Sequence, residues 1–247
     1  MSVAQLIKEV VVAPGQITAL SAMPGGDHIV IGDGDGGVQG LDYALSSAGP
    51  RVQLDSAVSA VAAGPGGTAV ALLDDKTYVV VDLDEGSTIG RGELTMEPTA
   101  AALSPDGGRL AVGGSAGEVG LLDLDSGEWI AATHPAHRQF VDGIAFSADG
   151  QMLVTSSFDA GVRMWNGVSG EPIAGVQVGQ NPSAAVSTVT PDGTGVIVAT
   201  RDGAVYRLDT RFEQWTDFAC AVAARNFTPQ EWVTYFGDQP YRETCSG

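Results

Sequence analysis

The sequence predicts an all-β fold made of about five repeats of four short strands, followed by a short helical tail. Three observations lead to this prediction. A glycine and an acid-type residue recur together five times, 16 positions apart. Strand-like runs and Gly/Pro/Asp turns alternate inside each period. The chain also carries 34 glycines, 12 prolines and only 17% charged residues, a composition typical of a turn-rich β domain.

Two residue types mark the repeat. The glycines are Gly26, Gly66, Gly107, Gly150 and Gly193, and the partners are Asp42, Asp82, Asp123, Asn166 and Asp209. Successive glycines are 40, 41, 43 and 43 residues apart, and the partners keep the same four intervals. Because two marks share one rhythm, the sequence predicts a repeat array.

Each period has the same order of elements. A small apolar run such as residues 58–63 comes first, and a PGG or PDG turn then reverses the chain. A β-branched or aliphatic run follows, then a third run such as residues 162–165, and last a weaker fourth run such as residues 172–178. Four short strands in about 40 residues make one blade of a β-propeller. We expect blades at about 14–55, 56–96, 97–138, 139–181 and 182–210.

The chain resembles the WD-repeat β-propellers over about residues 1–210. The best copy spans His137 to Glu171, where AH, VDGIAFSADG, MLVTSSFDAGVRMW and SGE follow one another in the order of that family. The resemblance implies a buried hydrogen-bonded network, formed here by His137, Thr155 or Ser157, Asp159 and Trp165. In the other repeats Leu41, Val81, Leu122 and Leu208 stand at the tryptophan position.

Blade five supplies three strands before the repeat ends near Asp209. The run at residues 6–12 precedes the first full repeat and has the composition of a strand, so we expect it to pair near residues 204–209 and close the ring. The family usually has seven blades. Two alternatives therefore stay open: a small closed ring, or an arc that another polypeptide or a second copy completes.

Residues 211–247 break the period and predict a helical tail that packs on the propeller. Thr228-Pro229-Gln230-Glu231 is a helix start signal with a capping box. The tail is rich in aromatic residues, and those predicted to dock on a surface are Trp215, Trp232, Tyr235 and Tyr241. The string DFACAVAARNFTPQEWVTYFGDQPYRETC resembles the end segment of bacterial STAND-type WD-repeat proteins. This resemblance implies a sensor module detached from its effector, because the chain has no GxxxxGK[ST] phosphate loop.

Both cysteines, Cys220 and Cys245, lie in this tail. They could form a disulfide that pins the last coil onto a short helix expected at residues 216–225, or they could remain two thiols, as a reducing cytoplasm would favour. Two thiols do not make a four-ligand zinc site.

The net charge is −18, and no Lys/Arg cluster offsets it locally. This charge disfavours nucleic acid and anionic membranes as partners. No apolar run is long enough for a membrane helix, and the first residues show no secretory signal. The expected compartment is the cytoplasm.

The sequence does not single out a catalytic site. His134 and His137 lie three residues apart without a third ligand nearby, and GDGDGG at residues 32–37 lacks the pattern of a helical calcium loop. We expect no cofactor and no metal. The leading function is a non-enzymatic scaffold that binds another protein, for example an effector, ATPase or protease subunit. The alternative is a propeller hydrolase or lactonase with an acidic channel site.

Overall fold

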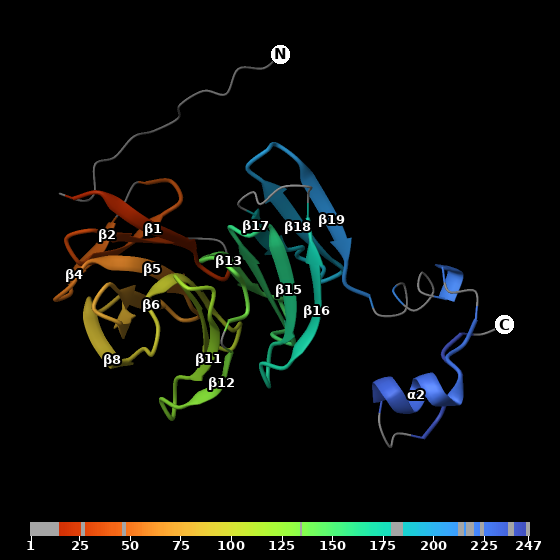
Figure 1. The fold of residues 1–247 in the computed structure, drawn as a ribbon. Coiled ribbons are helices and arrows are strands. Elements are labelled where there is room, and N and C mark those ends of the chain that lie inside the picture. Colours follow the sequence, from red (N-terminus) through yellow and green to blue (C-terminus); the bar gives the residue numbers. More distant parts are fainter. Residues whose placement is uncertain are drawn as a thin grey trace, which may run out of the picture.

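The computed structural model describes residues 15–25, 28–45, 48–133, 135–178, 185–211, 215, 220–222, 225–236 and 240–245. In this part of the chain the strands form five antiparallel sheets, four of four strands and one of three. Within every sheet the strands are neighbours in chain order, as in a propeller blade (Figure 1). The predicted all-β repeat fold is confirmed.

The blades have the following strands. Blade one contains β1 (Ile17–Ala22), β2 (His28–Asp33), β3 (Gly37–Asp42) and β4 (Ala48–Gln53). Blade two contains β5 (Val58–Ala63), β6 (Thr68–Leu73), β7 (Thr77–Asp82) and β8 (Ser87–Glu93). Blade three contains β9 (Pro98–Leu103), β10 (Arg109–Gly114), β11 (Val119–Asp123) and β12 (Trp129–Thr133). Blade four contains β13 (Val141–Phe146), β14 (Met152–Ser157), β15 (Gly161–Asn166) and β16 (Pro172–Gln177), and blade five contains β17 (Ala185–Val189), β18 (Gly195–Thr200) and β19 (Val205–Asp209).

The backbone conformation explains why glycine recurs at one position of the repeat. Gly66, Gly107, Gly150 and Gly193 all have positive φ, between 63° and 78°. They lie in the turn between the first and second strands of their blades, where a left-handed residue without Cβ lets the chain reverse at no steric cost. Gly26 lies outside the described residues.

The acid-type partner caps the turn that follows the third strand. Oδ1 of Asp82 accepts hydrogen bonds from the backbone N–H groups of Asp84 and Glu85. Oδ1 of Asn166 accepts from Val168 and Ser169 in the same way. Because asparagine and aspartate both present this oxygen, either residue satisfies the turn.

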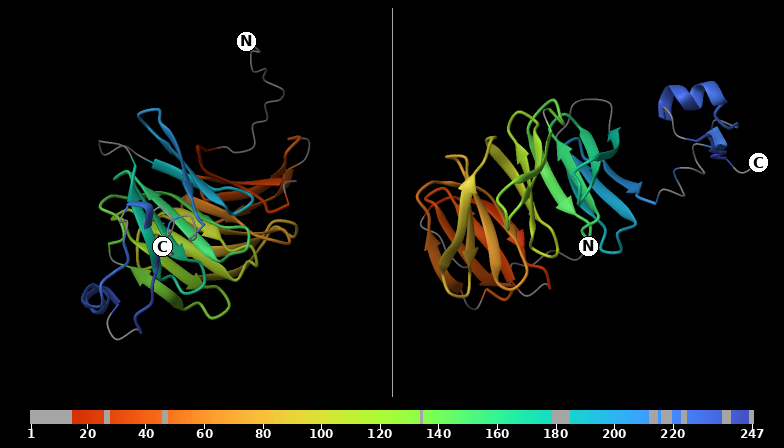
Figure 2. Two further views of the ribbon diagram at one scale, coloured as in Figure 1. Left: turned by 90° about the vertical axis from the view of Figure 1, so that its right-hand side faces the viewer. Right: turned by 90° about the horizontal axis from the view of Figure 1, so that it is seen from below.

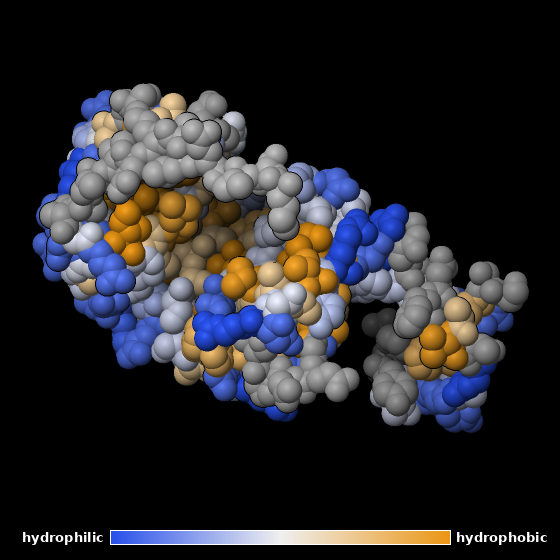
Figure 3. Space-filling view, turned by 90° about the horizontal axis from the view of Figure 1, so that it is seen from above, coloured by the Kyte–Doolittle hydropathy of each residue, from blue (hydrophilic) through white to orange (hydrophobic). Residues whose placement is uncertain are grey.

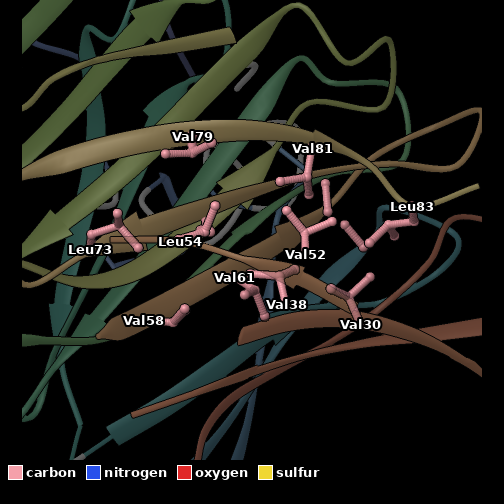
Figure 4. Packing of buried hydrophobic residues seen from close by; sticks show 13 residues of the cluster. Val30, Val38, Val52, Leu54, Val58, Val61, Leu73, Val79, Val81 and Leu83 are labelled. Carbon is pink, nitrogen blue, oxygen red and sulfur yellow. The ribbon is translucent and has the colours of Figure 1, made fainter. Parts of the chain in front are cut away.

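The core is divided among the joints between blades. The first cluster takes side chains from the sheets of blades one and two and from the segment that joins them, and Figure 4 shows these side chains interleaved. Its members include Val30, Val38 and Val52 from blade one and Val58, Val61, Leu73, Val79 and Val81 from blade two. Later clusters fill the joints between blades two and three, three and four, and four and five. Each sheet is therefore stabilised mainly by its neighbours along the chain.

The five blades follow one another in an arc, in the order of the sequence (Figures 1 and 2). Within the described residues blade five has three strands, and β19 forms its outer edge. The predicted closing strand at residues 6–12 lies outside the described residues, so closure of the ring by that segment stays a prediction.

The tail forms a small group beyond blade five. Its helix α2 (Pro229–Phe236) begins with a capping box: the N–H of Glu231 donates to Oγ1 of Thr228 at 3.3 Å, and the N–H of Thr228 donates to Oε2 of Glu231 at 2.9 Å. Figure 1 shows α2 apart from the blades. Among the described residues, no helix has the length and apolar character needed to span a bilayer.

Candidate functional site

One threonine stands at the centre of a buried polar network in blade four. Oγ1 of Thr155, on β14, lies 2.8 Å from Nε2 of His137 and accepts a hydrogen bond of 3.0 Å from Nε1 of Trp165. All three side chains are buried. β14 and β15 are adjacent strands, with Leu153 opposite Trp165 in the register, and the alternation of strand side chains then places Thr155 on the same face.

Asp159 ties the network to two loops. Its carboxylate accepts hydrogen bonds from the N–H groups of Arg138 at 2.8 Å and Gly161 at 2.7 Å, and Oδ1 lies 3.5 Å from Nδ1 of His137. The fifth predicted residue, Ser157, donates to the carbonyl of Gln139 at 2.9 Å instead of meeting the tryptophan. The structure thus brings the predicted residues together, with Thr155 at the centre and Ser157 holding the loop.

The proton positions follow from the donors and acceptors. Since Trp165 donates to Thr155, the threonine hydroxyl proton is free to point at Nε2 of His137. The imidazole is then neutral and carries its proton on Nδ1, facing Asp159. Burial lowers the pKa of His137, and the carboxylate of Asp159 only partly opposes this shift. For Asp159, burial alone would raise the pKa, but the N–H groups of Arg138 and Gly161 and the nearby His137 bring it below its ordinary value.

This site predicts acid-sensitive stability. Because the folded pKa of His137 is lowered, the unfolded chain takes up a proton below about pH 6.5 that the folded chain does not. The free energy of unfolding therefore decreases as the pH is lowered below this value. The stabilisation from Asp159 is present above about pH 4 and is lost as the pH falls through its lowered folded value. We expect the unfolding free energy, measured by denaturant titration at each pH, to change less between pH 7 and pH 5 for His137→Gln than for the wild type. The difference in this pH dependence should reach up to about 1.4 kcal/mol per pH unit.

The control is His28→Gln, because His28 is exposed at the start of β2. The unfolding free energy of this variant should depend on pH as that of the wild type does. Parallel pH profiles for His137→Gln and the wild type would contradict the neutral buried imidazole.

The two loops that the network holds carry an aromatic and cationic patch. The rings of Phe140 and Phe158 stack with centroids 5.0 Å apart, and the guanidinium of Arg201 lies 5.2 Å from the Phe158 ring centroid. The N–H of Phe158 also donates to the carbonyl of Phe140. Asp142 lies within the field of Arg201, and burial raises the pKa of its carboxyl although Arg201 opposes the shift. We call Phe140, Phe158, Arg201 and Asp142 the blade-four patch.

The sequence reading missed this patch. Phe140 follows His137 by three residues and Phe158 precedes Asp159 directly, so both flank network residues. An aromatic residue in a turn beside the network was the signal that could have identified them. Arg201 could not have been found in this way, because it belongs to blade five.

The other blades have an aliphatic residue at the position of Trp165 and lack the tryptophan of the network. Leu41, Val81 and Leu122 are buried where blade four has Trp165. An aliphatic side chain fills the space without an N–H that needs an acceptor, so these blades do not require the threonine or histidine.

The tail aromatics divide into two groups. Trp215 packs against the blade-four and blade-five core, and its Nε1 donates to the carbonyl of Asp209 at 2.5 Å. Trp232 is 2% exposed and meets Phe227 and Tyr241 edge to face, with centroids 6.3 Å and 5.6 Å apart. The side chain of Tyr235 lies outside the described residues. Docking on the propeller is thus seen for Trp215, whereas Trp232 and Tyr241 form a core inside the tail.

The two cysteines form a disulfide in the structure, with a separation of 25 residues. Asn226 fastens the same end of the chain, because its Oδ1 accepts from the N–H groups of Thr244 and Cys245 at 2.8 Å and 2.7 Å. Of the two alternatives left open by the sequence, the structure has the bridge.

No group of three or more His, Cys, Asp or Glu side chains suited to a metal ion occurs among the described residues. His28 and His137 belong to different blades, and His134 lies outside the described residues. The acidic loop at residues 32–37 has a structural role: Oδ1 of Asp33 accepts from the N–H groups of Asp35 and Gly37, and Arg51 pairs with its other oxygen.

Comparison with known proteins addresses the family. The family model described as WD domain, G-beta repeat matches residues 128–166, from the end of blade three through β15. This stretch includes four network residues, His137, Thr155, Asp159 and Trp165. Residues 128–166 are a WD40 repeat. The resemblance inferred from the sequence is confirmed for this repeat, and the likeness of the tail to bacterial STAND-type proteins stays a prediction.

Parts of three larger proteins are similar to the chain. SEC12-like protein 1 of Arabidopsis thaliana is 30% identical over 93 residues, which are 38% of the chain and 23% of that protein. Pre-mRNA-processing factor 19 homolog 2 of the same plant is 35% identical over 95 residues, 37% of the chain and 18% of the relative. Telomerase protein component 1 of Mus musculus is 33% identical over 107 residues, 41% of the chain and 4% of the relative. The matched region thus spans less than a quarter of each of these curated relatives.

Proposed function

We propose that this protein is a non-enzymatic protein-interaction scaffold that binds its partner through the blade-four patch. The observation that carries the proposal is the geometry of that patch. Two stacked phenylalanines and an arginine, residue types enriched at the cores of protein interfaces, lie on the loops beside blade four, which holds the His137–Thr155–Trp165 network. Because Asp159 and Ser157 hydrogen-bond to the backbone of these loops, the patch is preorganised and little entropy is lost when a partner binds.

Two observations support a protein as the partner: the net charge of the chain, and its similarity to known proteins. A net charge of −18 disfavours nucleic acid and anionic lipid. The WD40 repeat and the similarity to parts of larger proteins fit a module that works within an assembly. The finer role, a detached sensor or adaptor of a bacterial signalling or defence system in the cytoplasm, rests on the resemblance of the tail and stays a prediction, as does the absence of catalysis.

Affinity capture from the native host tests the patch. We expect Arg201→Glu to lower the recovery of the specific partner about tenfold or more, because the substitution removes the cation and places a second carboxylate beside Asp142. Arg91→Glu is the matched control, since Arg91 is an exposed arginine on β8 of blade two. Equal recovery with both variants would place the partner elsewhere and refute this function of the patch.

A further inference from the structure

The two ends of the arc expose positions that are buried everywhere else. The first residue of the first strand is buried in blades two to five, at Val58, Pro98, Val141 and Ala185, but Ile17 in blade one is 48% exposed. The next-to-last residue of the second strand shows the reverse pattern, because it is exposed in the last blade and buried in the others. It is buried at Gly32, Leu72, Gly113 and Ser156 in blades one to four, and exposed at Ala199 in blade five.

Within the chain these two positions meet at the joints between blades. A methyl group placed on Gly32 would lie 2.5 Å from Cγ1 of Val58, and one on Gly113 would lie 2.5 Å from Cγ1 of Val141. At these two joints the side chain that begins a blade therefore fits against a glycine in the blade before it. We call the inserting side chain the knob of the joint and the small residue that receives it the seat. Ile17 is a knob without a seat in the described part of the chain, and Ala199 is a seat without a knob there.

Apolar side chains surround both. Leu20, on β1 beside Ile17, is 63% exposed. On blade five Val186 and Val205 lie opposite Ala199 in the register of β17, β18 and β19, and they are 54% and 70% exposed. We call Ile17 and Leu20 the knob face, and Val186, Ala199 and Val205 the seat face. Hydrophobic residues also line the hollow of the arc (Figure 3).

We propose that a second copy of this chain occupies these faces, with the knob face of one copy on the seat face of the next. The two faces are complementary halves of a joint that the chain already makes between blades one and two and between blades three and four, so a second copy supplies both halves. The interface is heterologous, and it generates a ring or an open chain of copies.

Light scattering and sedimentation of the purified protein test this proposal independently of the blade-four patch. The mass should increase with protein concentration, and it should increase further with salt, because each copy carries a net charge of −18 that opposes association. We expect Val186→Glu on the seat face and Leu20→Glu on the knob face to weaken association by about tenfold or more. Ile89→Glu is the matched control, since Ile89 is similarly exposed on the outer strand β8. A wild-type protein that stays monomeric under all these conditions would overturn the proposal.

Mixing the two variants distinguishes a heterologous joint from general stickiness. The Leu20→Glu copy keeps its seat face and the Val186→Glu copy keeps its knob face, so the mixture should form a one-to-one dimer that neither variant forms alone. Circular dichroism checks that both variants are folded. If mixing restores nothing, the proposed joint is wrong.

A cysteine pair, Ile17→Cys with Ala199→Cys, then identifies which chains meet. Covalent dimers and longer species on oxidation would support the joint between copies. A covalent monomer would mean that one chain closes on itself, and it would overturn the proposal without affecting the blade-four patch.

Discussion

Thr155→Val is expected to lower the free energy of unfolding by about 2–5 kcal/mol, because it removes the one atom that satisfies two buried groups. Nε2 of His137 and Nε1 of Trp165 both use Oγ1 of Thr155. Valine has nearly the same shape, so the space remains filled while both nitrogens lose their partner in a site that water does not reach. Urea or thermal unfolding followed by circular dichroism measures the change.

Two control variants separate the hydroxyl from the packing. Thr155→Ser keeps the oxygen and loses one methyl group, and should cost about 1 kcal/mol. Thr77→Val removes a hydroxyl that is bonded only at the surface, to Asp75, and should stay within about 0.5 kcal/mol of the wild type. If the valine and serine variants at position 155 were equally stable, the hydrogen bonds of Thr155 would not contribute to the stability of blade four.

The second large effect is expected in the tail. Replacing Cys220 and Cys245 with serine should destabilise the tail by about 3 kcal/mol, the usual contribution of a disulfide of this separation. Among the described residues of the tail only Trp232 is buried, so a loss of this size should unfold the tail locally. We expect amide hydrogen exchange in residues 226–245 to lose protection, while the blades keep theirs.

Reduction of the wild-type protein with dithiothreitol should have the same effect as the double serine variant. Two titratable thiols in the denatured, unreduced protein would show that the bridge is absent and would contradict this prediction. The same titration on protein from the host tests the predicted compartment, since a disulfide is unusual in a reducing cytoplasm.

The strands were predictable because their signals are local. The glycine with positive φ and the acid-type turn cap each act within one turn, so their rhythm located the blades. The strand Val58–Ala63 has the bounds expected from the sequence. Thr155 could be named together with Ser157, but choosing between them required the register of β14 and β15. In that register Thr155 faces Trp165, whereas Ser157 reaches the loop.

Features that join distant segments were not predictable. Arg201 reaches Phe158 from the β18–β19 turn, 43 positions away in the numbering, and no local pattern indicates that two turns of neighbouring blades meet. The same applies to the tail. Its composition predicted buried aromatics, but it could not show that Trp215 would lie on blade five while Trp232 found its neighbours within the tail.

The central claim is that the blade-four patch binds a partner protein. Hydrogen exchange of the protein with and without its captured partner tests it most directly. We predict new protection in residues 138–142, 157–161 and 200–203, with little change on the outer strands β8 and β12. Protection confined to residues 225–245 would instead make the tail the binding element and would contradict the claim.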